Sequence, residues 1–179
     1  MTDNNKPYIK VEHLKKYFST KRGMLHAVDD VSFEIQRGET LGLVGESGCG
    51  KSTLGRCLIR LLDSTSGSVM LQNPEDGSCI DVTKVDAATM KDLRKRVQIV
   101  FQDPYSCLNP RLSVWELIAE PLMVNRVYSD KAAMRKRIRE LMSTVGLAER
   151  LENSYPHELD GGRRQRIGIA RSLALNPEF

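Results

Sequence analysis

The sequence lacks the cysteine pairs that structural zinc sites and iron–sulfur clusters use. Its four cysteines, Cys49, Cys57, Cys79 and Cys107, include no CxxC pair. Such metal sites take their thiolate ligands at short, fixed spacings. We therefore expect four reduced, independent thiols.

Long apolar runs are also missing. The N-terminal stretch has no hydrophobic signal segment, and no window approaches the roughly 18 to 20 apolar residues that span a bilayer. On this basis we expect a cytosolic chain, which does not exclude docking onto a membrane protein.

Neither sign of charge dominates, and histidine is scarce. The chain has 27 lysines and arginines against 23 aspartates and glutamates, for a net charge of +4. This small excess favours an ordinary solvated surface and gives no nucleic-acid-binding pattern. We expect His13, His26 and His157 at surface or loop positions and not in catalysis.

Enough apolar residues are present for a packed domain. With 179 residues, 40% of them hydrophobic, the chain can form one well-cored domain with an inserted lobe. Short apolar or alternating runs predict strands at residues 8–11, 31–35, 40–44, 68–72 and 97–101. Of these, 40–44 and 97–101 are expected in the sheet interior. Helices are predicted from Lys51 onward and over 88–96.

After residue 103 the pattern changes from strands to helices, which predicts a helical lobe over residues 104–162. Its clearest helix follows Ser129 or Asp130 as N-cap and stops at Gly146. That helix carries apolar residues on one face, namely Met134, Ile138, Leu141, Met142 and Val145. A last helix is predicted over residues 163–175.

A phosphate-binding motif separates the predicted strand at 40–44 from the helix that follows it. The motif GxxxxGK[ST] is matched in full by Gly45, Glu46, Ser47, Gly48, Cys49, Gly50, Lys51 and Ser52. Its glycines let successive backbone N–H groups converge on phosphate oxygens, and the helix adds the positive end of its dipole. The motif therefore predicts binding of a nucleoside triphosphate.

The side chains at the end of this motif predict how the nucleotide and its metal are held. Lys51 would place its charge on the β and γ phosphates, and the hydroxyl of Ser52 would ligate Mg²⁺. Thr53 could reach the α phosphate. The expected ligands are therefore ATP and Mg²⁺.

Two further segments decide among the classes of phosphate-loop protein. Residues 100–111 read VFQDPYSCLNPR, and residues 159–171 read LDGGRRQRIGIAR, a diglycine directly before a helix. With the phosphate loop, they resemble the ATP-binding subunits of ABC transporters, in particular those of bacterial oligopeptide and dipeptide importers. The resemblance implies an α/β fold: a P-loop NTPase (RecA-like) core with N-terminal antiparallel strands and an inserted helical subdomain, incomplete at the C-terminus.

By this resemblance, the nucleotide-binding core covers residues 1–103 and 163–179, and the helical subdomain covers 104–162. Gln102 is similar to the Q-loop glutamine, which touches Mg²⁺ or the attacking water. Phe18 looks like the aromatic residue that stacks on adenine, with Tyr17 as the next candidate. The signature segment Asp160, Gly161 and Gly162 would act in trans, its amides capping the γ phosphate bound by the opposite subunit of a dimer.

The sequence departs from the family's LSGGQ signature at two positions. Asp160 replaces the serine and Arg163 replaces the glutamine. A carboxylate repels phosphate, so we expect Asp160 to cap the helix or to pair with Arg163 or Arg164. That arrangement would leave the glycine amides free to act.

The resemblance also implies residues that this sequence does not contain. The family's next strand carries the Walker B aspartate and the catalytic glutamate, and the switch histidine follows; the chain stops at Phe179, where that strand would begin. Hydrolysis needs the metal held and the water oriented. Full-length members are ATP hydrolases, whereas we expect this C-terminally truncated chain to bind ATP better than it hydrolyses it.

The implied partners are a second ATP-binding subunit, in a homodimer or heterodimer, and transmembrane permease subunits, with no nucleic acid. The implied location is the cytoplasmic face of the cell membrane, held peripherally. Exposed apolar residues within 108–122, Trp115 among them, are the expected docking face. Two alternatives stay open: a P-loop kinase of small molecules, and an inactive nucleotide-binding paralogue.

Overall fold

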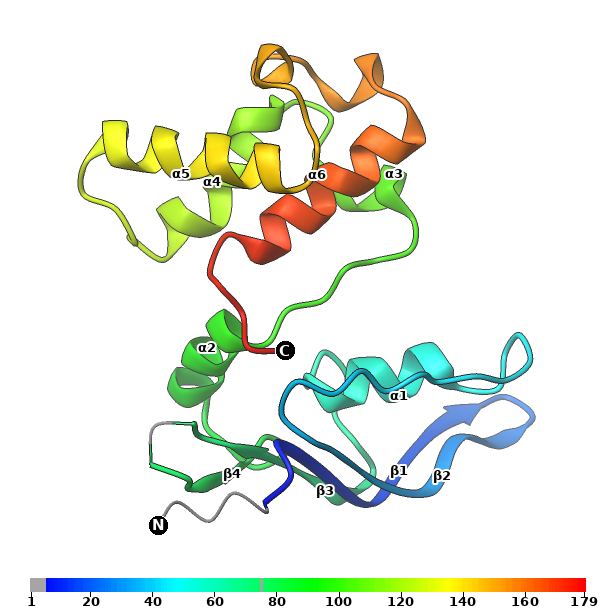
Figure 1. Ribbon diagram of the computed structural model, residues 1–179. Helices are drawn as coiled ribbons and strands as arrows, with labels where there is room; N and C mark the ends of the chain where they lie inside the picture. Colours follow the sequence, from blue (N-terminus) through cyan, green and yellow to red (C-terminus); the bar gives the residue numbers. More distant parts are fainter. Residues whose placement is uncertain (1–5, 75) are drawn as a thin grey trace. The chain divides into compact units, whose positions relative to one another are not determined.

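The computed structural model describes residues 6–74 and 76–179, and the chain divides into two compact units (Figure 1). The first unit runs from Met1 to Lys91 and the second from Asp92 to Phe179. The first contains a β-sheet, and the second is built from helices.

An antiparallel sheet of four strands, in the spatial order β2-β1-β3-β4, forms the first unit. Its strands are β1 (Ile9–Thr20), β2 (Gly23–Ile35), β3 (Ser66–Gln72) and β4 (Cys79–Asp81). These elements confirm the predicted strands at 8–11, 31–35 and 68–72. The first two strands are longer than predicted, because the turn at residues 21–22 folds them into one extended hairpin.

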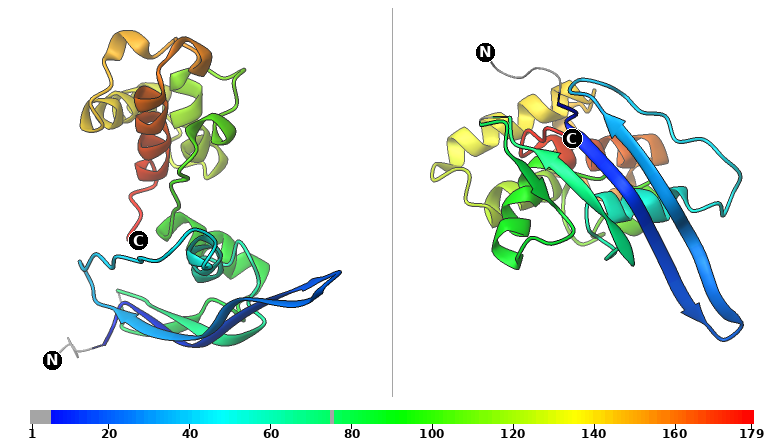
Figure 2. Two further views of the ribbon diagram at one scale, coloured as in Figure 1. Left: turned by 90° about the vertical axis from the view of Figure 1, so that its right-hand side faces the viewer. Right: turned by 90° about the horizontal axis from the view of Figure 1, so that it is seen from below.

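Helix α1 (Lys51–Leu58) lies over one face of this sheet (Figure 1, Figure 2). It buries Leu54 and Cys57, and the strands bury apolar residues that include Leu14 and Val28. The helix predicted from Lys51 is therefore confirmed. Helix α2 (Ala87–Arg96) confirms the helix predicted over 88–96.

The predicted interior strand at residues 40–44 is wrong. This segment has no regular secondary structure, and Leu41, Leu43 and Val44 are 45%, 50% and 92% exposed. A strand needs a neighbouring backbone to accept its hydrogen bonds. The strands of the described sheet pair with one another and leave this segment outside the ladder.

The predicted interior strand at residues 97–101 is also wrong. Its residues are irregular, and Val100 and Phe101 are 45% and 41% exposed. The amide of Phe179 donates to the carbonyl of Arg96 at 3.1 Å, and the amide of Gln98 donates to the carbonyl of Phe179 at 2.9 Å. These two hydrogen bonds follow the pattern of a parallel strand pair. They involve only Phe179 on the opposite side, however, and do not make a ladder.

Helices form the second unit around one apolar cluster. They are α3 (Pro104–Cys107), α4 (Val114–Val124), α5 (Lys131–Thr144), the 3₁₀ turns η1 (Glu149–Leu151) and η2 (Pro156–Glu158), and α6 (Gly161–Leu173). Val114, Ile118, Ile138 and Ile167 are 0% exposed in the cluster. Helix α6 packs against α3, α4 and α5.

The helix predicted around Met134 and Ile138 is confirmed as α5. Of the two predicted N-caps, Asp130 is the one used: its carboxylate accepts hydrogen bonds from the amides of Ala132 at 3.0 Å and Ala133 at 3.2 Å. Gly146 follows the helix with a φ of 70°, as a helix stop requires. The last helix, α6, begins at Gly161, two residues before the predicted start at 163.

The prediction of exposed apolar residues within 108–122 is wrong for most of that stretch. Its apolar residues Leu108, Val114, Leu117, Ile118 and Leu122 are at most 6% exposed. Trp115 is half-buried and packs against the same cluster. The amphipathic helix α4 turns this face toward its own helical core.

The two compact units do not coincide with the domains expected from the resemblance. The boundary falls at residues 91 and 92, within α2, and α6 belongs to the helical unit. Assignment of residues 1–103 and 163–179 to a nucleotide-binding core, and of 104–162 to a helical subdomain, stays a proposal.

Candidate functional site

The phosphate loop is an exposed turn that leads into α1. Residues 45–49 are exposed, and the helix begins at Lys51 directly after Gly50, which acts as its N-cap. Gly50 has a φ of 97°, a left-handed conformation that other residues rarely adopt. A Cβ at this position would lie 2.0 Å from the carbonyl oxygen of Ala27 on β2. The sheet and the glycine together therefore fix where the helix starts.

Lys51 extends its ammonium group back into the curl of the loop. Its Nζ donates hydrogen bonds to the carbonyl oxygens of Gly45 at 2.8 Å and Glu46 at 2.5 Å, and lies 3.5 Å from Sγ of Cys49. One positive charge therefore sits within the loop. A helix N-terminus with a lysine at this position attracts a phosphate group.

The residues present fit a triphosphate with its metal. Ser52 and Thr53 lie in the first turn of α1, with Ser52 exposed and Thr53 half-buried. A hydroxyl oxygen beside phosphate oxygens is a donor set that Mg²⁺ accepts. In the described parts of the chain, the structure gathers no group of three or more His, Cys, Asp or Glu side chains suited to a metal ion. A metal here would take its other ligands from phosphate oxygens, water and neutral side chains.

Gln102 lies in the second unit, in the irregular segment before α3. It is exposed, and it follows 97–101, which is not the strand that we expected. The next residue, Asp103, caps α3 by accepting a hydrogen bond from the amide of Tyr105 at 2.9 Å. The ring of Tyr105 in turn lies under the guanidinium of Arg164 on α6, 4.0 Å from the ring centroid. The segment after Gln102 is thus held against the diglycine helix.

The diglycine forms the first turn of α6, and Asp160 caps it. The carboxylate of Asp160 accepts a hydrogen bond from the amide of Arg163 at 2.8 Å and pairs with its guanidinium at 3.4 Å. Both expectations for Asp160, that it caps the helix and that it pairs with an arginine, are confirmed. The hydrogen bond from the Arg163 amide is the main reason why the pKa of Asp160 lies below its usual range.

The two candidate aromatic residues on β1 have different surroundings. Tyr17 stacks on His26, with ring centroids 3.9 Å apart, and its hydroxyl donates to Asp29. This hydrogen bond raises the pKa of Tyr17 and lowers that of Asp29. The ring of Phe18 lies 4.9 Å from the ammonium of Lys16. Sequence reasoning missed the contact between Tyr17 and His26, although hairpin pairing places these residues opposite each other.

Comparison with known proteins gives the family. A model of the family described as ABC transporter matches residues 28–179. This chain belongs to the ABC transporter family. The match includes the phosphate loop, residues 100–111 and the diglycine helix, and it does not favour the small-molecule kinase that the phosphate loop alone left open.

Curated relatives carry names that refer to oligopeptide transport. The oligopeptide transport ATP-binding protein OppF of Bacillus subtilis is 48% identical over 171 residues, which cover 96% of this chain and 54% of the relative. The protein of the same name from Haemophilus influenzae is 43% identical over 170 residues, covering 95% of this chain and 49% of the relative. The chain thus spans about half the length of these relatives.

Solved structures confirm the expected fold class, an α/β P-loop NTPase of the ABC type. The dimeric structure of MJ0796, a bacterial ABC transporter cassette, has a TM-score of 0.83 and 32% identity, covering 94% of this chain and 70% of that one. The cassette cbiO1 of Clostridium perfringens, part of the transporter complex cbiONQ, has a TM-score of 0.75 and 28% identity, covering 97% and 63%. MJ0796 was also solved in a dimeric state bound to ADP and Pi.

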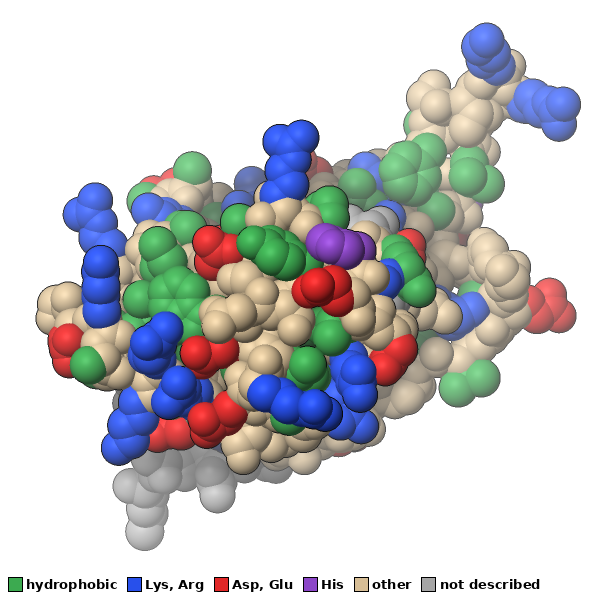
Figure 3. All heavy atoms as spheres, turned by 90° about the horizontal axis from the view of Figure 1, so that it is seen from above, with side chains coloured by type: hydrophobic (Ala, Val, Ile, Leu, Met, Phe, Trp, Pro, Cys, Tyr) green, Lys and Arg blue, Asp and Glu red, His purple; other side chains and the backbone are tan. Residues whose placement is uncertain are grey.

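The surface and the helices give two further facts. On the face drawn in Figure 3, basic, acidic and apolar side chains lie interspersed, without one broad area of a single kind. Within residues 6–74 and 76–179, no helix combines the length and the apolar character that crossing a membrane requires.

Proposed function

We propose that this chain is an ATP-binding portion of a bacterial ABC importer for oligopeptides or dipeptides. The observation that carries the proposal is the phosphate loop, where Lys51 places its ammonium inside the curl formed by Gly45 and Glu46. In this role the loop holds the phosphates of ATP, Lys51 neutralises the β and γ phosphates, and Ser52 ligates Mg²⁺. The names of the curated relatives support the peptide substrate class.

The proposed site is composite and is shared by two subunits. The glycine amides at the start of α6, Gly161 and Gly162 after Asp160, would face the γ phosphate held by a second ATP-binding subunit, in a homodimer or heterodimer. Gln102 would contact Mg²⁺ or the attacking water, and Phe18 would stack on adenine. The dimeric state of the MJ0796 cassette supports such an arrangement.

In the whole transporter, closure of this dimer by ATP would drive transmembrane permease subunits, and the chain would sit peripherally at the cytoplasmic face of the cell membrane. For residues 1–179 alone we expect slow hydrolysis. In this family a glutamate orients the attacking water. None of the residues that we matched to the family's site corresponds to that glutamate. ATP binding and ATP cleavage are therefore separable properties of this chain.

The experiment measures the affinity for Mg·ATP by isothermal titration and the ATPase rate on the same samples. Lys51→Ala is expected to weaken ATP binding at least tenfold, because it removes the charge that faces the phosphates. Lys91→Ala, which removes an exposed lysine from α2, is the matched control and is expected to bind like the parent chain.

Two results would contradict the proposal. Equal ATP affinity of the parent and the Lys51→Ala chain would remove the phosphate loop as the site. Rapid hydrolysis by residues 1–179 would contradict the expected separation of binding from cleavage. Tight binding without turnover, persisting when the chain is joined to a complete partner, would favour the inactive nucleotide-binding paralogue.

A further inference from the structure

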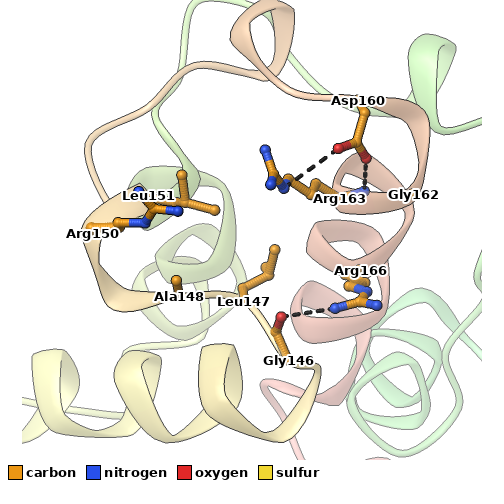
Figure 4. Close-up of a pocket in the computed structure, with 9 residues that line it drawn as sticks. All are labelled: Gly146, Leu147, Ala148, Arg150, Leu151, Asp160, Gly162, Arg163 and Arg166. Atoms are coloured by element: carbon orange, nitrogen blue, oxygen red, sulfur yellow. Dashed lines mark hydrogen bonds and ion pairs between the residues drawn. The ribbon is translucent and has the colours of Figure 1, made fainter.

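The connection between α4 and α5 is a surface of the second unit that lies outside the proposed nucleotide site. A cavity of about 320 Å³ lies between the start of α6 and the segment that leaves α5 (Figure 4), and its lining includes Asp160 and Gly162 of the signature segment. Residues 125–130, which connect α4 to α5, lie outside this lining. They precede the first turn of α5, whereas the cavity begins after its last turn, and the helix is 14 residues long.

Apolar side chains become exposed where α4 ends. Leu122, one residue before the change, is 1% exposed and belongs to the helical core. Met123 and Val124 are 57% and 69% exposed, and Val127 and Tyr128 are 49% and 36% exposed. Single exposed apolar residues are ordinary on protein surfaces, whereas a contiguous group marks an interaction site.

A defined turn holds these side chains at the surface. The amide of Val127 donates to the carbonyl of Leu122 at 3.0 Å, and the amide of Arg126 donates to the carbonyl of Met123 at 3.1 Å. Together these bonds form the Schellman motif that ends many helices. Arg126 takes the motif's left-handed position, with a φ of 52°. The apolar group is therefore exposed by an ordered backbone.

Positive charge is concentrated around the same turn. Residues 121–139 contain six basic residues and one acidic residue, a net charge of +5, whereas the whole chain has a net charge of +4. The basic residues are Arg126, Lys131, Arg135, Lys136, Arg137 and Arg139. The carboxylate of the acidic residue, Asp130, accepts hydrogen bonds from two amides at the start of α5.

The cations of this segment differ in their partners. Arg135 and Arg139 pair with Glu152 at 3.9 Å and 3.2 Å, and Arg137 pairs with Glu140 at 3.8 Å. Among the residues that the structure describes, no ion pair engages the other three cations, which are exposed. They are Arg126, Lys131 and Lys136. These three charges are available to an anionic partner.

We propose that this surface contacts the anionic headgroups of a lipid bilayer. We call it the α4–α5 tip, and it consists of Met123, Val124, Arg126, Val127, Tyr128, Lys131 and Lys136. Aliphatic side chains flanked by cations are typical of proteins that lie on anionic membranes, and tyrosine favours the headgroup level. Nucleic acid would use the cations and leave the aliphatic side chains without a role.

The contact is independent of the phosphate loop and agrees with the peripheral location that we propose. The test is flotation of the parent chain with vesicles of equimolar phosphatidylcholine and phosphatidylglycerol. Vesicles of phosphatidylcholine alone provide the neutral comparison. Aggregated protein sinks in such a gradient and is not counted as bound. Binding is expected with the anionic vesicles at low salt, and high salt is expected to release it.

Two matched double variants test the cations. Lys131→Gln with Lys136→Gln is expected to lower the partition coefficient at least tenfold, because each cation near an anionic surface contributes roughly fivefold. Lys91→Gln with Arg94→Gln removes two exposed cations from α2 and is expected to bind vesicles like the parent chain. An equal loss in the two pairs would show that overall charge, and not the α4–α5 tip, controls binding.

A second pair of variants tests the apolar side chains. Val124→Ser with Val127→Ser is expected to lower vesicle binding roughly fivefold or more. The control is Met24→Ser with Leu25→Ser, which changes residues 62% and 55% exposed on the β1–β2 hairpin and is expected to have no effect. Both tip variants are expected to bind ATP like the parent chain, so failure of the tip is distinguishable from failure of the phosphate loop.

A measurement on the parent chain keeps the test valid if a variant does not fold. Anionic bicelles that carry a spin-labelled lipid are expected to broaden the amide resonances of residues 123–128 before those of the β1–β2 hairpin. Equal flotation with neutral and anionic vesicles, or a loss of binding in the hairpin variant alone, would overturn the proposal. Binding to polyglutamate without flotation would also overturn it, because that result identifies an acidic protein as the partner.

Discussion

At the scale of the residue, one close approach of two backbones fixes the phosphate loop. Gly50 has a φ of 97°, and a Cβ at this position would lie 2.0 Å from the carbonyl oxygen of Ala27. A larger residue would have to move the loop away from β2. The motif in the sequence requires a glycine here, and the contact with Ala27 supplies the physical reason.

Gly50→Ala is expected to lower the free energy of unfolding by about 1–3 kcal/mol, because alanine strains this conformation and meets the backbone of Ala27. Urea denaturation monitored by circular dichroism measures the change. Gly55→Ala is the matched control, since Gly55 lies within α1 and a Cβ at that position would meet nothing within 4 Å. We expect that control to be stabilising by about 0.5–1 kcal/mol, and equal effects of the two substitutions would contradict the argument.

The cap at Asp160 predicts a dependence on pH. Its pKa lies below the usual 3.8, chiefly through the hydrogen bond from the amide of Arg163. A carboxylate with a lowered pKa stabilises the fold above its usual pKa and loses that contribution as pH falls through the folded value. Asp160→Asn is therefore expected to be less stable than the parent chain at neutral pH, with the difference shrinking below pH ~4.

Urea denaturation of both chains between pH ~2.5 and ~6 measures this difference. Arg163→Gln serves as the control for the cause, because it removes the charged side chain but keeps the backbone amide. That variant is expected to retain most of the pH dependence. A parent-minus-variant difference for Asp160→Asn that stays constant across the range would show that the cap does not act through its charge.

At the scale of the element, the helices of the second unit follow from their apolar stripes. Helix α5 buries Met134, Ile138, Leu141 and Met142 and leaves its basic residues outside. Spacing and capping residues alone predict such a helix, because both are local properties of the chain. The direction in which α4 turns its apolar face was not predictable in the same way, since it depends on α5 and α6.

Ile138→Ala is expected to destabilise the second unit by about 2–5 kcal/mol, because the side chain is 0% exposed and its loss leaves a cavity. Lys136→Ala, an exposed position on the same helix, is expected to change stability by no more than about 0.5 kcal/mol. Thermal or urea unfolding of the two variants provides the comparison. Similar effects of both would contradict the burial of this face.

At the scale of the whole molecule, the exposed apolar segment at residues 40–44 has the clearest consequence. Leu41, Leu43 and Val44 present side chains to solvent ahead of the phosphate loop. Exposed apolar runs without a paired backbone promote self-association. Isolated preparations of residues 1–179 are therefore expected to bind hydrophobic dyes and to aggregate as concentration rises.

Val44→Glu is expected to reduce dye binding and light scattering, because Val44 is 92% exposed and the new charge interrupts the apolar run. Thr40→Glu adds the same charge to an exposed position that contributes no large apolar side chain. It is expected to have a smaller effect. If both variants scatter light like the parent chain, another surface causes the association.

The sequence by itself determined the features that depend on near neighbours along the chain. The phosphate loop before α1, an N-cap at residue 129 or 130 and a helix beginning at or just after the diglycine are local features; the structure has the loop as predicted, uses Asp130 as the cap and starts α6 at Gly161. Family membership also follows from such short segments. The apolar pattern of residues 40–44 and 97–101 favoured buried strands, but such a pattern does not show which strand would pair with them.

The tertiary structure decided those features that depend on contacts between distant parts of the chain. The strand predictions at 40–44 and 97–101 failed, because a ladder exists only where a second backbone lies alongside. The cavity beside α6 likewise escaped prediction, since its lining residues come together only when the segment after α5 folds against α6. Caps, turns and the phosphate loop depend on residues that are near one another in the sequence. Strand pairing and the lining of a cavity depend on which distant segments the fold brings together.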